Sequence, residues 1–527
     1  MGPGFAYIPG DLLDNRFNNY ILEHFYRWVI GRDASYWNAG IYFPFPNTIA
    51  FSENLLGTAP LYACFRWLGY DRETSFQAWY ILGFFFNFAS SFYVFQKIGA
   101  KPLASGAGAF FYSFGLPIMG QEIHAQLVYR CGVPLACYFF WDFSERPKLW
   151  KLLLVGLCFI WQIYISIYNG IFLGLLLLAI FILFPFFLLP PPGESPLMTL
   201  PRKLQNAWRE TPLIWRTIFV ASSTALLASL FALLWPYYSV TKMYGFTRTS
   251  SEVFSLLPKP ESYILADNSL IWGNLSASLP NIKFFRWEHQ LFPGLSVIIM
   301  ILASFVWRPK LEYRRLAWLH FCAMLMLIGV TFDFHGYSLY HLLSIFPGIN
   351  SIRAVTRIVL ILMWPTAVFI TSVLDSMLEL TFSGKTRTAN WLAYIFISLL
   401  LIETLAFRHL HFSKADAQNR LAEIKNMIPA DTPQDPILVL HIIQQDWYQD
   451  GINEIDAMLV AQDLGWPTLN GYSGNSPKGY VVPNTCRRVH EPILAYMHFA
   501  GITNQQFYRR MSNRIIPLGF TDCDLRE

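Results

Sequence analysis

The sequence is poor in charged residues. Only 14% of its 527 residues are Asp, Glu, Lys or Arg, whereas soluble domains average about 25%. Hydrophobic residues make up 54% of the chain, and the mean hydropathy is +0.35. This balance excludes an ordinary soluble globular protein and predicts a membrane protein. The net charge of +5 is too small to indicate a nucleic-acid partner.

Cysteine is also scarce, with seven residues and no C-x-x-C spacing that would indicate a metal centre. Five of the seven lie in or beside apolar runs, where cysteine behaves as a small buried hydrophobe; these are Cys64, Cys131, Cys137, Cys158 and Cys322. Cys486 and Cys523 lie in the more polar C-terminal part of the chain.

Long apolar runs, in contrast, are abundant. A membrane-spanning helix needs about 20 mostly apolar residues, and about ten segments are predicted to span: 75–96, 102–119, 126–143, 149–168, 171–190, 214–238, 291–307, 316–333, 358–380 and 390–407. A shorter run at 55–68, interrupted by Pro60 and Arg66, is typical of a helix at the membrane surface. The predicted fold class is an α-helical polytopic membrane protein.

Basic residues set the orientation of these helices, because Lys and Arg concentrate in cytoplasmic loops. If the segment before the first span lies outside, five inside loops hold 15 of them: Lys97, Lys101, Arg146, Lys148, Lys151, Arg202, Lys203, Arg209, Arg216, Arg308, Lys310, Arg314, Arg315, Lys385 and Arg387. The short outside connections near 120–125 and 169–170 hold none. Residues 1–74, the loop 241–290 and everything after 408 are therefore predicted to be extracytoplasmic.

The first segment has no signal peptide and no apolar run before residue 20. An exported segment needs a preceding anchor, so we expect one further helix ahead of it, about eleven natively. Three regions are predicted. They are a first extracytoplasmic loop at 1–74, a transmembrane domain at 75–407 with a cytoplasmic linker at 191–213, and an extracytoplasmic soluble domain at 408–527.

The C-terminal region is predicted to be a small α/β unit. Residues 437–442 and 467–470 have strand character, and 452–465 have the apolar spacing of a helix. Disulfides persist outside the cytoplasm, so Cys486 and Cys523 are predicted to pair. Closing a loop of this length stabilises a fold by roughly 3–4 kcal/mol in the chain-entropy model.

Three polar clusters carry the candidate site. The first is the segment Gly10–His24, which holds three carboxylates, a His and an Arg. Asp11 or Asp14 could remove a proton from an acceptor hydroxyl, or hold a metal ion. Alternatively, Asp11 caps the following helix, and Asp14 lies in its first turn and favours the helix dipole.

The second cluster, Gly120–Gln126, holds Glu122 and His124 in a short turn between two spans. Polar groups near membrane depth tend to be functional, although a solvated turn would also explain them. The third cluster holds Arg353 and Arg357, which share one face if helical. Two guanidiniums at the outer mouth of a span suit a phosphate; snorkelling or pairing with a loop acid such as Glu288 is the alternative.

Taken together, these segments resemble a bacterial branch of the C-type (GT-C) superfamily of integral membrane glycosyltransferases. That superfamily includes protein O-mannosyltransferases, aminoarabinose transferases and oligosaccharyltransferases. The resemblance rests on several short segments and not on one decisive motif: Gly10–Asp14, the aromatic residues Trp28, Tyr36 and Trp37, Phe51–Asn54, Gln121–Leu127, Pro347–Arg357 and the Asn470–Pro477 run in the tail.

The resemblance implies a polyprenyl-phosphate-linked sugar donor and an active site at the outer face of the cell (inner) membrane. It also implies an essential acid in the first outer loop, which maps first to Asp11 and second to Asp14. The acid would serve as base or hold a divalent cation, and Arg353 and Arg357 would bind the lipid phosphate. His124 and Glu122 would orient donor or acceptor, the acceptor being an envelope glycan, glycolipid or protein. These groups are expected to share one outward-opening pocket, within roughly 15 Å of each other.

The alternative function is a transporter or flippase for a lipid-linked or anionic solute, which would need a polar path through the membrane. The acids of the spans instead lie toward their ends; these are Asp333, Asp375, Glu379 and Glu403. This distribution favours an outer-face site. A non-catalytic assembly protein is the third interpretation.

The orientation can be tested with phosphatase fusions, because the enzyme is active only when exported. A fusion at about residue 420 is expected to be active, and fusions at about 200 and 386 inactive, from the positive-inside rule. The reverse pattern would contradict the orientation and the outer-face site together.

Overall fold

The computed structural model describes residues 1–187, 195–279, 282, 284–304, 311–343, 348–349, 352–379, 387–442, 447–520 and 523, without the side chains of 311–313, 379, 387–390 and 447–449. Several residues used above lie outside these ranges. They are the start of the predicted linker (191–194), the basic residues Arg308, Lys310 and Lys385, and Pro347, Asn350 and Ser351 of the Pro347–Arg357 segment. The side chains of Glu379 and Arg387 also lie outside them.

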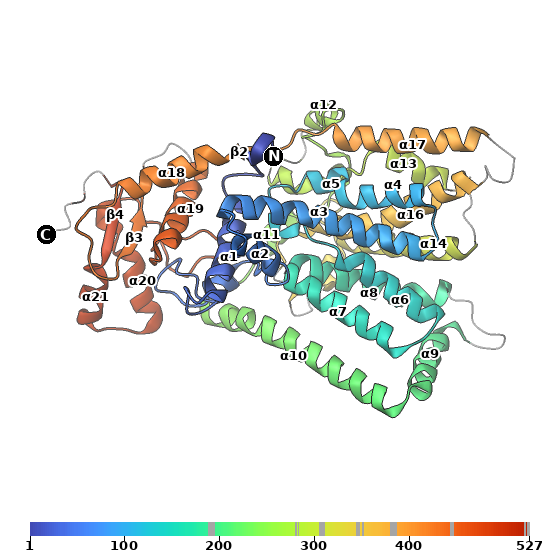
Figure 1. Cartoon of the computed structure of the whole chain (residues 1–527), viewed down its shortest axis with the longest axis horizontal. Helices are drawn as coiled ribbons and strands as arrows, with labels where there is room; N and C mark the ends of the chain where they lie inside the picture. Colours follow the sequence, from blue (N-terminus) through green and yellow to red (C-terminus); the bar gives the residue numbers. More distant parts are fainter. Residues whose placement is uncertain are drawn as a thin grey trace.

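The first segment holds two α-helices joined by a long connection. A 3-10 turn η1 (Pro3–Phe5) and a short strand β1 (Tyr7–Pro9) lead into α1 (Asp14–Val29), which is followed by η2 (Thr48–Phe51) and α2 (Ala59–Trp67). The last of these lies within the predicted surface helix at 55–68. Figure 1 shows α1 and α2 between the helical bundle and the C-terminal elements.

Most helices of the bundle are apolar and run along the long axis of the molecule, whereas the basic α9 lies across it (Figure 1). In chain order they are α3 (Arg72–Lys97), α4 (Pro102–Phe114), α5 (Leu116–Met119), α6 (Gly132–Glu145), α7 (Leu149–Ile165), α8 (Ile167–Phe187), α9 (Pro196–Glu210), α10 (Leu213–Tyr244), α13 (Leu295–Ala303), α14 (Leu311–Thr331), α16 (Val359–Glu379) and α17 (Arg387–Leu405). The central helix is α16, packed against α4, α14, α13 and α17. The largest apolar cluster surrounds it.

Five helices among the described residues are long and apolar enough to cross a membrane. They are Arg72–Lys97, Ile167–Phe187, Leu213–Tyr244, Arg314–Thr331 and Val355–Leu378. Two shorter apolar helices are Leu149–Ile165 and Trp391–Leu405. These apolar helices indicate a multi-pass membrane protein, whereas the total of about ten spans stays a prediction.

Three predicted spans differ clearly from the observed helices. The described part of 291–307 forms only the nine residues of α13. The segment 102–119 is interrupted at Gly115, where a side chain would lie 2.8 Å from the carbonyl oxygen of Phe111. The segment 126–143 begins with the 3-10 turn η3 (Ala125–Leu127), and α6 begins only at Gly132. The resulting helices, α4 and α6, have 13 and 14 residues, fewer than the roughly 20 that a bilayer requires.

The loops predicted to be cytoplasmic lie at one end of the bundle. The backbone N–H of Lys101 donates to Asp375 Oδ1 over 2.7 Å, and Arg315 lies 3.9 Å from Glu145. Lys203, on α9, donates to the carbonyl oxygen of Ser144. These contacts join the connection after α3 to the end of α16, and the connections after α6 and α8 to each other and to the start of α14. Figure 1 shows these helix ends at one end of the bundle, as the charge pattern predicts.

Short elements cover the opposite end of the bundle. They are α11 (Ser250–Ser255), η4 (Pro260–Ile264), α12 (Gly273–Ala277), η5 (Arg286–His289), α15 (Tyr340–Leu343) and η7 (Val355–Ile358). Glu403 accepts the backbone N–H groups of Leu295 and Ser296 at the start of α13. This contact fixes α17 against α13 where the chain leaves the bundle for the tail.

The tail alternates helices and short strands: β2 (His411–Ser413), α18 (Lys414–Asn426), β3 (Ile437–Leu440), α19 (Trp447–Leu464), η8 (Cys486–Arg488), α20 (Glu491–Ala500), α21 (Gln505–Ser512) and β4 (Ile515–Leu518). Strands β3 and β4 pair in parallel, with Ile437 opposite Ile515. The predicted strand at 467–470 is only an isolated bridge between Thr468 and Leu438. The strand that pairs with β3 over its whole length is instead β4, which was not predicted.

The first segment and the tail pack as one body, although they are nearly 400 residues apart. Strands β1 and β2 pair antiparallel, with Ile8 opposite Phe412. The buried Arg16 of α1 donates to Asp456 of α19 over 2.7 Å. Leu22 and Met458 belong to a single apolar cluster that spans both segments. The position of α1 therefore depends on the tail.

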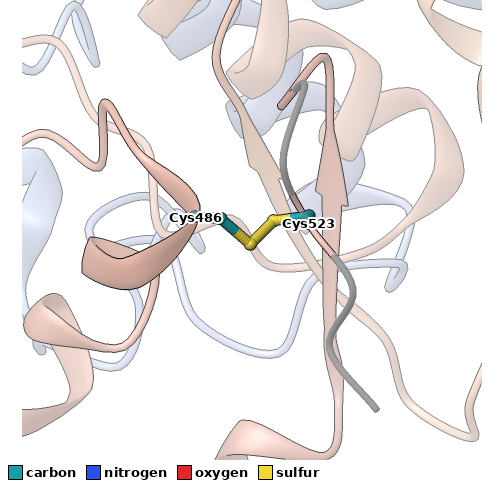
Figure 2. The surroundings of a disulfide bond; sticks show 2 residues. All are labelled: Cys486 and Cys523. Atoms are coloured by element: carbon teal, nitrogen blue, oxygen red, sulfur yellow. A yellow bond between two sulfur atoms is a disulfide. The ribbon is translucent and has the colours of Figure 1, made fainter. Parts of the chain in front are cut away.

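The tail is closed by the predicted disulfide. Cys486 and Cys523 are bonded, with their Cα atoms 5.2 Å apart (Figure 2). The bond joins η8 to the chain that follows β4. The prediction made from the cysteine positions is thus confirmed.

Replacing Cys486 by Ser is expected to lower the free energy of unfolding of the tail by roughly 3–4 kcal/mol, because the unfolded chain regains the entropy of an open loop. Protease cleavage of the tail across a denaturant series, on the full chain in detergent, measures this. Cys64→Ser, at an exposed free cysteine, is the matched control. Equal midpoints for the two variants under non-reducing conditions would contradict the prediction.

Candidate functional site

The acidic segment Gly10–His24 begins in the loop before α1 and continues into that helix. Asp14 is the first residue of that helix. Asp11 Oδ1 accepts the backbone N–H of Asn15 in the first turn over 3.2 Å, although the residue at the N-cap position is Leu13. A carboxylate at the position of Asp14 is favoured by the helix dipole, and its side chain also contacts His124 and Tyr472 from two other parts of the chain.

The turn Gly120–Gln126 docks directly on α1. Asn15 donates from Nδ2 to the carbonyl oxygen of Glu122 over 3.1 Å, and its Oδ1 accepts the N–H of Ala125 over 3.0 Å. Asn18 donates to Gln126 over 2.8 Å. Glu122 and His124 are both buried, so the interpretation of a solvated turn is wrong.

His124 lies between two carboxylates. Its Nδ1 is 2.9 Å from Asp14 Oδ2, and its Nε2 is 3.2 Å from Glu288 Oε1. Burial and the nearby Arg357 lower the pKa of His124, but the carboxylates of Glu288 and Asp14 outweigh them and raise it above 6.5. The ring thus links Asp14 to Glu288, and its Nε2 is also 3.1 Å from Arg357 Nη2.

Arg357 completes this network from the mouth of α16. It donates from Nε to Glu288 Oε2 over 3.0 Å and from Nη2 to Glu288 Oε1 over 2.6 Å. Its guanidinium also lies 5.0 Å from the centre of the Tyr168 ring. Pairing with Glu288, which the sequence left as an alternative to phosphate binding, is therefore what the structure shows for Arg357.

The network is buried at one end and open at the other. The side chains of Glu288 and Arg357 are 3% and 6% exposed, that of His124 is 6% exposed, and that of Asp14 is 27% exposed. With His124 protonated, two cations balance two carboxylates. Asp14 is the group through which this network can meet a molecule from outside.

Arg353 lies apart from Arg357. It precedes η7 and is not on a common helix face with Arg357, so the predicted four-residue helical spacing is wrong. Its side chain is 35% exposed, and its Nη1 is 3.6 Å from Glu252 Oε1. Its backbone N–H donates to the Tyr168 hydroxyl over 3.2 Å. Arg353 is therefore the more accessible cation at the mouth of the span.

Glu122 points away from the network, toward the chain that leaves α17. Its Oε2 is 3.0 Å from His409 Nδ1, and its Oε1 accepts the backbone N–H of Leu410. The structure thus brings together Asp14, His124 and Arg357 of the predicted residues, places Asp11 beside them, and gives Glu122 a contact with the start of the tail.

Two residues of the network were not among the predicted site residues. Glu288 was considered only as a neutralising partner, and Tyr472 only as part of the Asn470–Pro477 run. The Tyr472 hydroxyl donates to Asp14 Oδ1 over 2.6 Å. No local pattern marks either residue, because the contacts join segments more than 60 residues apart.

The two acids of the first segment differ in pKa. Burial and the negative charge of Asp14 raise the pKa of Asp11 to about 6. Burial also acts to raise that of Asp14, but hydrogen bonds from His124 and Tyr472 outweigh it and lower the pKa of Asp14 below 3.8. Asp14 is therefore ionised at neutral pH, whereas Asp11 titrates just below neutral pH.

A divalent cation does not fit these residues as they are arranged. Both ring nitrogens of His124 are in contact with carboxylates, and both oxygens of Glu288 accept from Arg357. Within the described ranges, no three His, Cys, Asp or Glu side chains converge as ligands. No chemical step is therefore assigned to a metal.

No protein-family model and no curated protein matches the sequence. Three solved structures of an oligosaccharyltransferase from Archaeoglobus fulgidus are similar in fold. One is AglB with an inhibitory peptide and a dolichol-phosphate (12% identity, TM-score 0.45, covering 97% of this chain and 66% of that one). The second is a complex with Zn and sulfate (11% identity, TM-score 0.45, covering 97% of this chain and 64% of that one). The third is an apo form (12% identity, TM-score 0.47, covering 98% of this chain and 65% of that one).

This chain thus spans slightly less than two thirds of the length of those proteins. With TM-scores below 0.5 and identities near one residue in eight, function has to be inferred from the contacts within this chain itself.

Replacing Glu288 by Ala is expected to destabilise the protein by about 3–5 kcal/mol, because it leaves the Arg357 guanidinium buried without a counter-charge. Glu252→Ala is the matched control. It removes the partner of the half-exposed Arg353 and is expected to cost at most about 1 kcal/mol. Denaturant unfolding in detergent measures both. Equal losses would contradict the assignment of Arg357–Glu288 as the buried pair that holds the site.

Proposed function

We propose that this protein is a membrane glycosyltransferase that moves a sugar from a polyprenyl-phosphate-linked donor to an acceptor at the outer face of the membrane. The observation that carries the proposal is Asp14, whose side chain is 27% exposed and whose Oδ2 is held by the buried His124–Glu288–Arg357 network. A carboxylate that is held in place at one oxygen and reaches the surface is suited to remove a proton from an acceptor.

In the proposed step, Asp14 takes the proton of an acceptor hydroxyl while the hydroxyl oxygen bonds to the anomeric carbon of the sugar. The bond from that carbon to the phosphate oxygen breaks, and its electron pair leaves with the polyprenyl phosphate. The proton then passes from Asp14 to water. Because the phosphate is a good leaving group, the chemistry needs mainly a base and correct positioning of both substrates.

The remaining residues have positioning roles in this proposal. Arg353, which is 35% exposed at the mouth of the span, is the cation for the lipid phosphate. Arg357 and Glu288 orient His124, and His124 orients Asp14. Glu122 holds the turn that carries His124 against the start of the tail through His409.

The proposed site lies at the end of the bundle opposite the basic loops, which by the charge pattern is the outer face of the cell inner membrane. The donor would arrive within the bilayer, beside the start of α16. The acceptor, an envelope glycan, glycolipid or protein, would arrive from outside, beside α1 and the tail.

A transporter or flippase is less well supported by the contacts of the described residues. Asp375 accepts the backbone N–H of Lys101 at one end of α4, and Glu403 caps α13. The fully buried Arg130 donates to the carbonyl oxygens of Leu127 and Tyr112 over 3.2 and 3.3 Å, near the break between α4 and α5. Each of these groups supports a helix end or a turn.

Asp14→Asn is expected to abolish transfer while leaving the fold intact, because the amide keeps the shape of the side chain but cannot take a proton. Mass spectrometry of envelope glycans and glycolipids in a deletion strain identifies the product. The wild type and Asp431→Asn, a control at an exposed acid of the tail, should restore it. Restoration by Asp14→Asn to the wild-type level would contradict the role of Asp14.

A further inference from the structure

The tail reaches into the proposed site through one side chain. Tyr472 follows β3 and α19 in the chain, and its hydroxyl donates to Asp14 Oδ1 over 2.6 Å. The other oxygen, Oδ2, is in contact with His124 Nδ1 over 2.9 Å. Oδ1 is therefore the oxygen on which an acceptor can place a proton, and Tyr472 covers it.

The turn that carries Tyr472 is held in place by contacts with α19 and with the first segment. Glu454 accepts from Asn470 Nδ2 over 2.9 Å and from the N–H of Gly471 over 2.7 Å. Gly471 lies so close to Tyr42 that an added Cβ would approach its ring to 2.3 Å. The backbone of the turn is thus locked between α19 and the first segment, and cannot withdraw without opening that interface.

The Tyr472 side chain itself is less constrained. It is only partly buried, and its ring packs edge-on against Phe17 at 5.6 Å between centroids. A change of side-chain rotamer would uncover Asp14 Oδ1 without moving the locked turn. The group that can move aside for an incoming molecule is therefore the phenol, which rotates about its own side-chain bonds while the turn stays in place.

We infer that Tyr472 occupies the acceptor subsite of the proposed transferase, and that the acceptor is a hydroxyl compound that displaces the Tyr472 phenol from Asp14. The inference rests on the proposed function for the identity of the reaction. An alcohol replaces the phenol one for one, because it brings a single O–H donor and an oxygen nucleophile. A sugar, a lipid alcohol or a Ser, Thr or Tyr side chain shares this chemistry.

The cover is tested by carboxyl labelling of the full-length protein in detergent with a water-soluble carbodiimide and glycine ethyl ester, read by mass spectrometry. Tyr472→Phe and Tyr472→Ala are expected to speed labelling of Asp14 by about tenfold, the factor that corresponds to losing about 1.4 kcal/mol of hydrogen bond to a charged group. Asp33, paired with His24 and Arg27, is the internal reference. Tyr496→Phe, which removes a hydroxyl from α20, is the control.

The subsite is tested in Tyr472→Ala with two small probes of the same shape. p-Cresol restores the missing phenol and is expected to slow labelling of Asp14 back toward the wild-type rate. Toluene fills the same space without a hydroxyl and is expected to leave the fast rate unchanged. Equal protection by both would show an apolar cavity only, and protection by neither would show no subsite; either result overturns the inference.

An unchanged rate of Asp14 labelling in both Tyr472 variants would contradict the inference that Tyr472 covers Asp14. Labelling requires no sugar donor and no turnover. A failure of the proposed transfer reaction, seen as an unaltered envelope in the deletion strain, is therefore distinguishable from a failure of the Tyr472 inference.

Discussion

The buried pair of Arg357 and Glu288 is the contact on which the candidate site depends. A guanidinium at the mouth of α16 is too costly to leave unpaired in a buried position, so the outer loop that carries Glu288 must lie across that mouth. Glu288 then has His124 on the same oxygen that accepts from Arg357. Through His124, the position of a membrane helix determines that of Asp14 on α1.

The same arrangement ties the tail to the membrane helices. Arg16 and Asp456 join α1 to α19, Asn15 joins α1 to the turn of His124, and Tyr472 closes on Asp14. The first segment, the membrane helices and the tail therefore contribute to one site. A substitution that loosens the tail therefore also disturbs the contacts of the Asp14 carboxylate.

The sequence was sufficient for features that depend on local composition and periodicity. Apolar runs located the helices, the spacing of 437–442 located β3, and the charge of the loops predicted which helix ends lie together. The outer acids, His124 and the arginines were recognised as functional candidates because polar groups are rare in such a chain. Pairing Cys486 with Cys523 followed from their being the two cysteines outside apolar runs.

What the sequence left undecided depends on contacts between distant segments. Whether Arg353 or Arg357 is the buried cation is decided by Glu288, some 70 residues earlier, and the ionisation of Asp14 depends on Tyr472, some 460 residues later. At the Gly115 break an added Cβ would come within 2.4 Å of Met363, a close approach that hydropathy does not report. The strand β4 is too short to be recognised without its partner.

The most direct test of this account is the pH dependence of donor consumption by the purified protein. If Asp14 is the base, its lowered pKa keeps it ionised, so the rate is predicted to stay constant from pH 7 down to pH 5. If Asp11 is the base, its pKa of about 6 predicts a rate that falls by half near pH 6 and continues to fall below it. The second result would contradict the role assigned to the Asp14–His124–Glu288–Arg357 network.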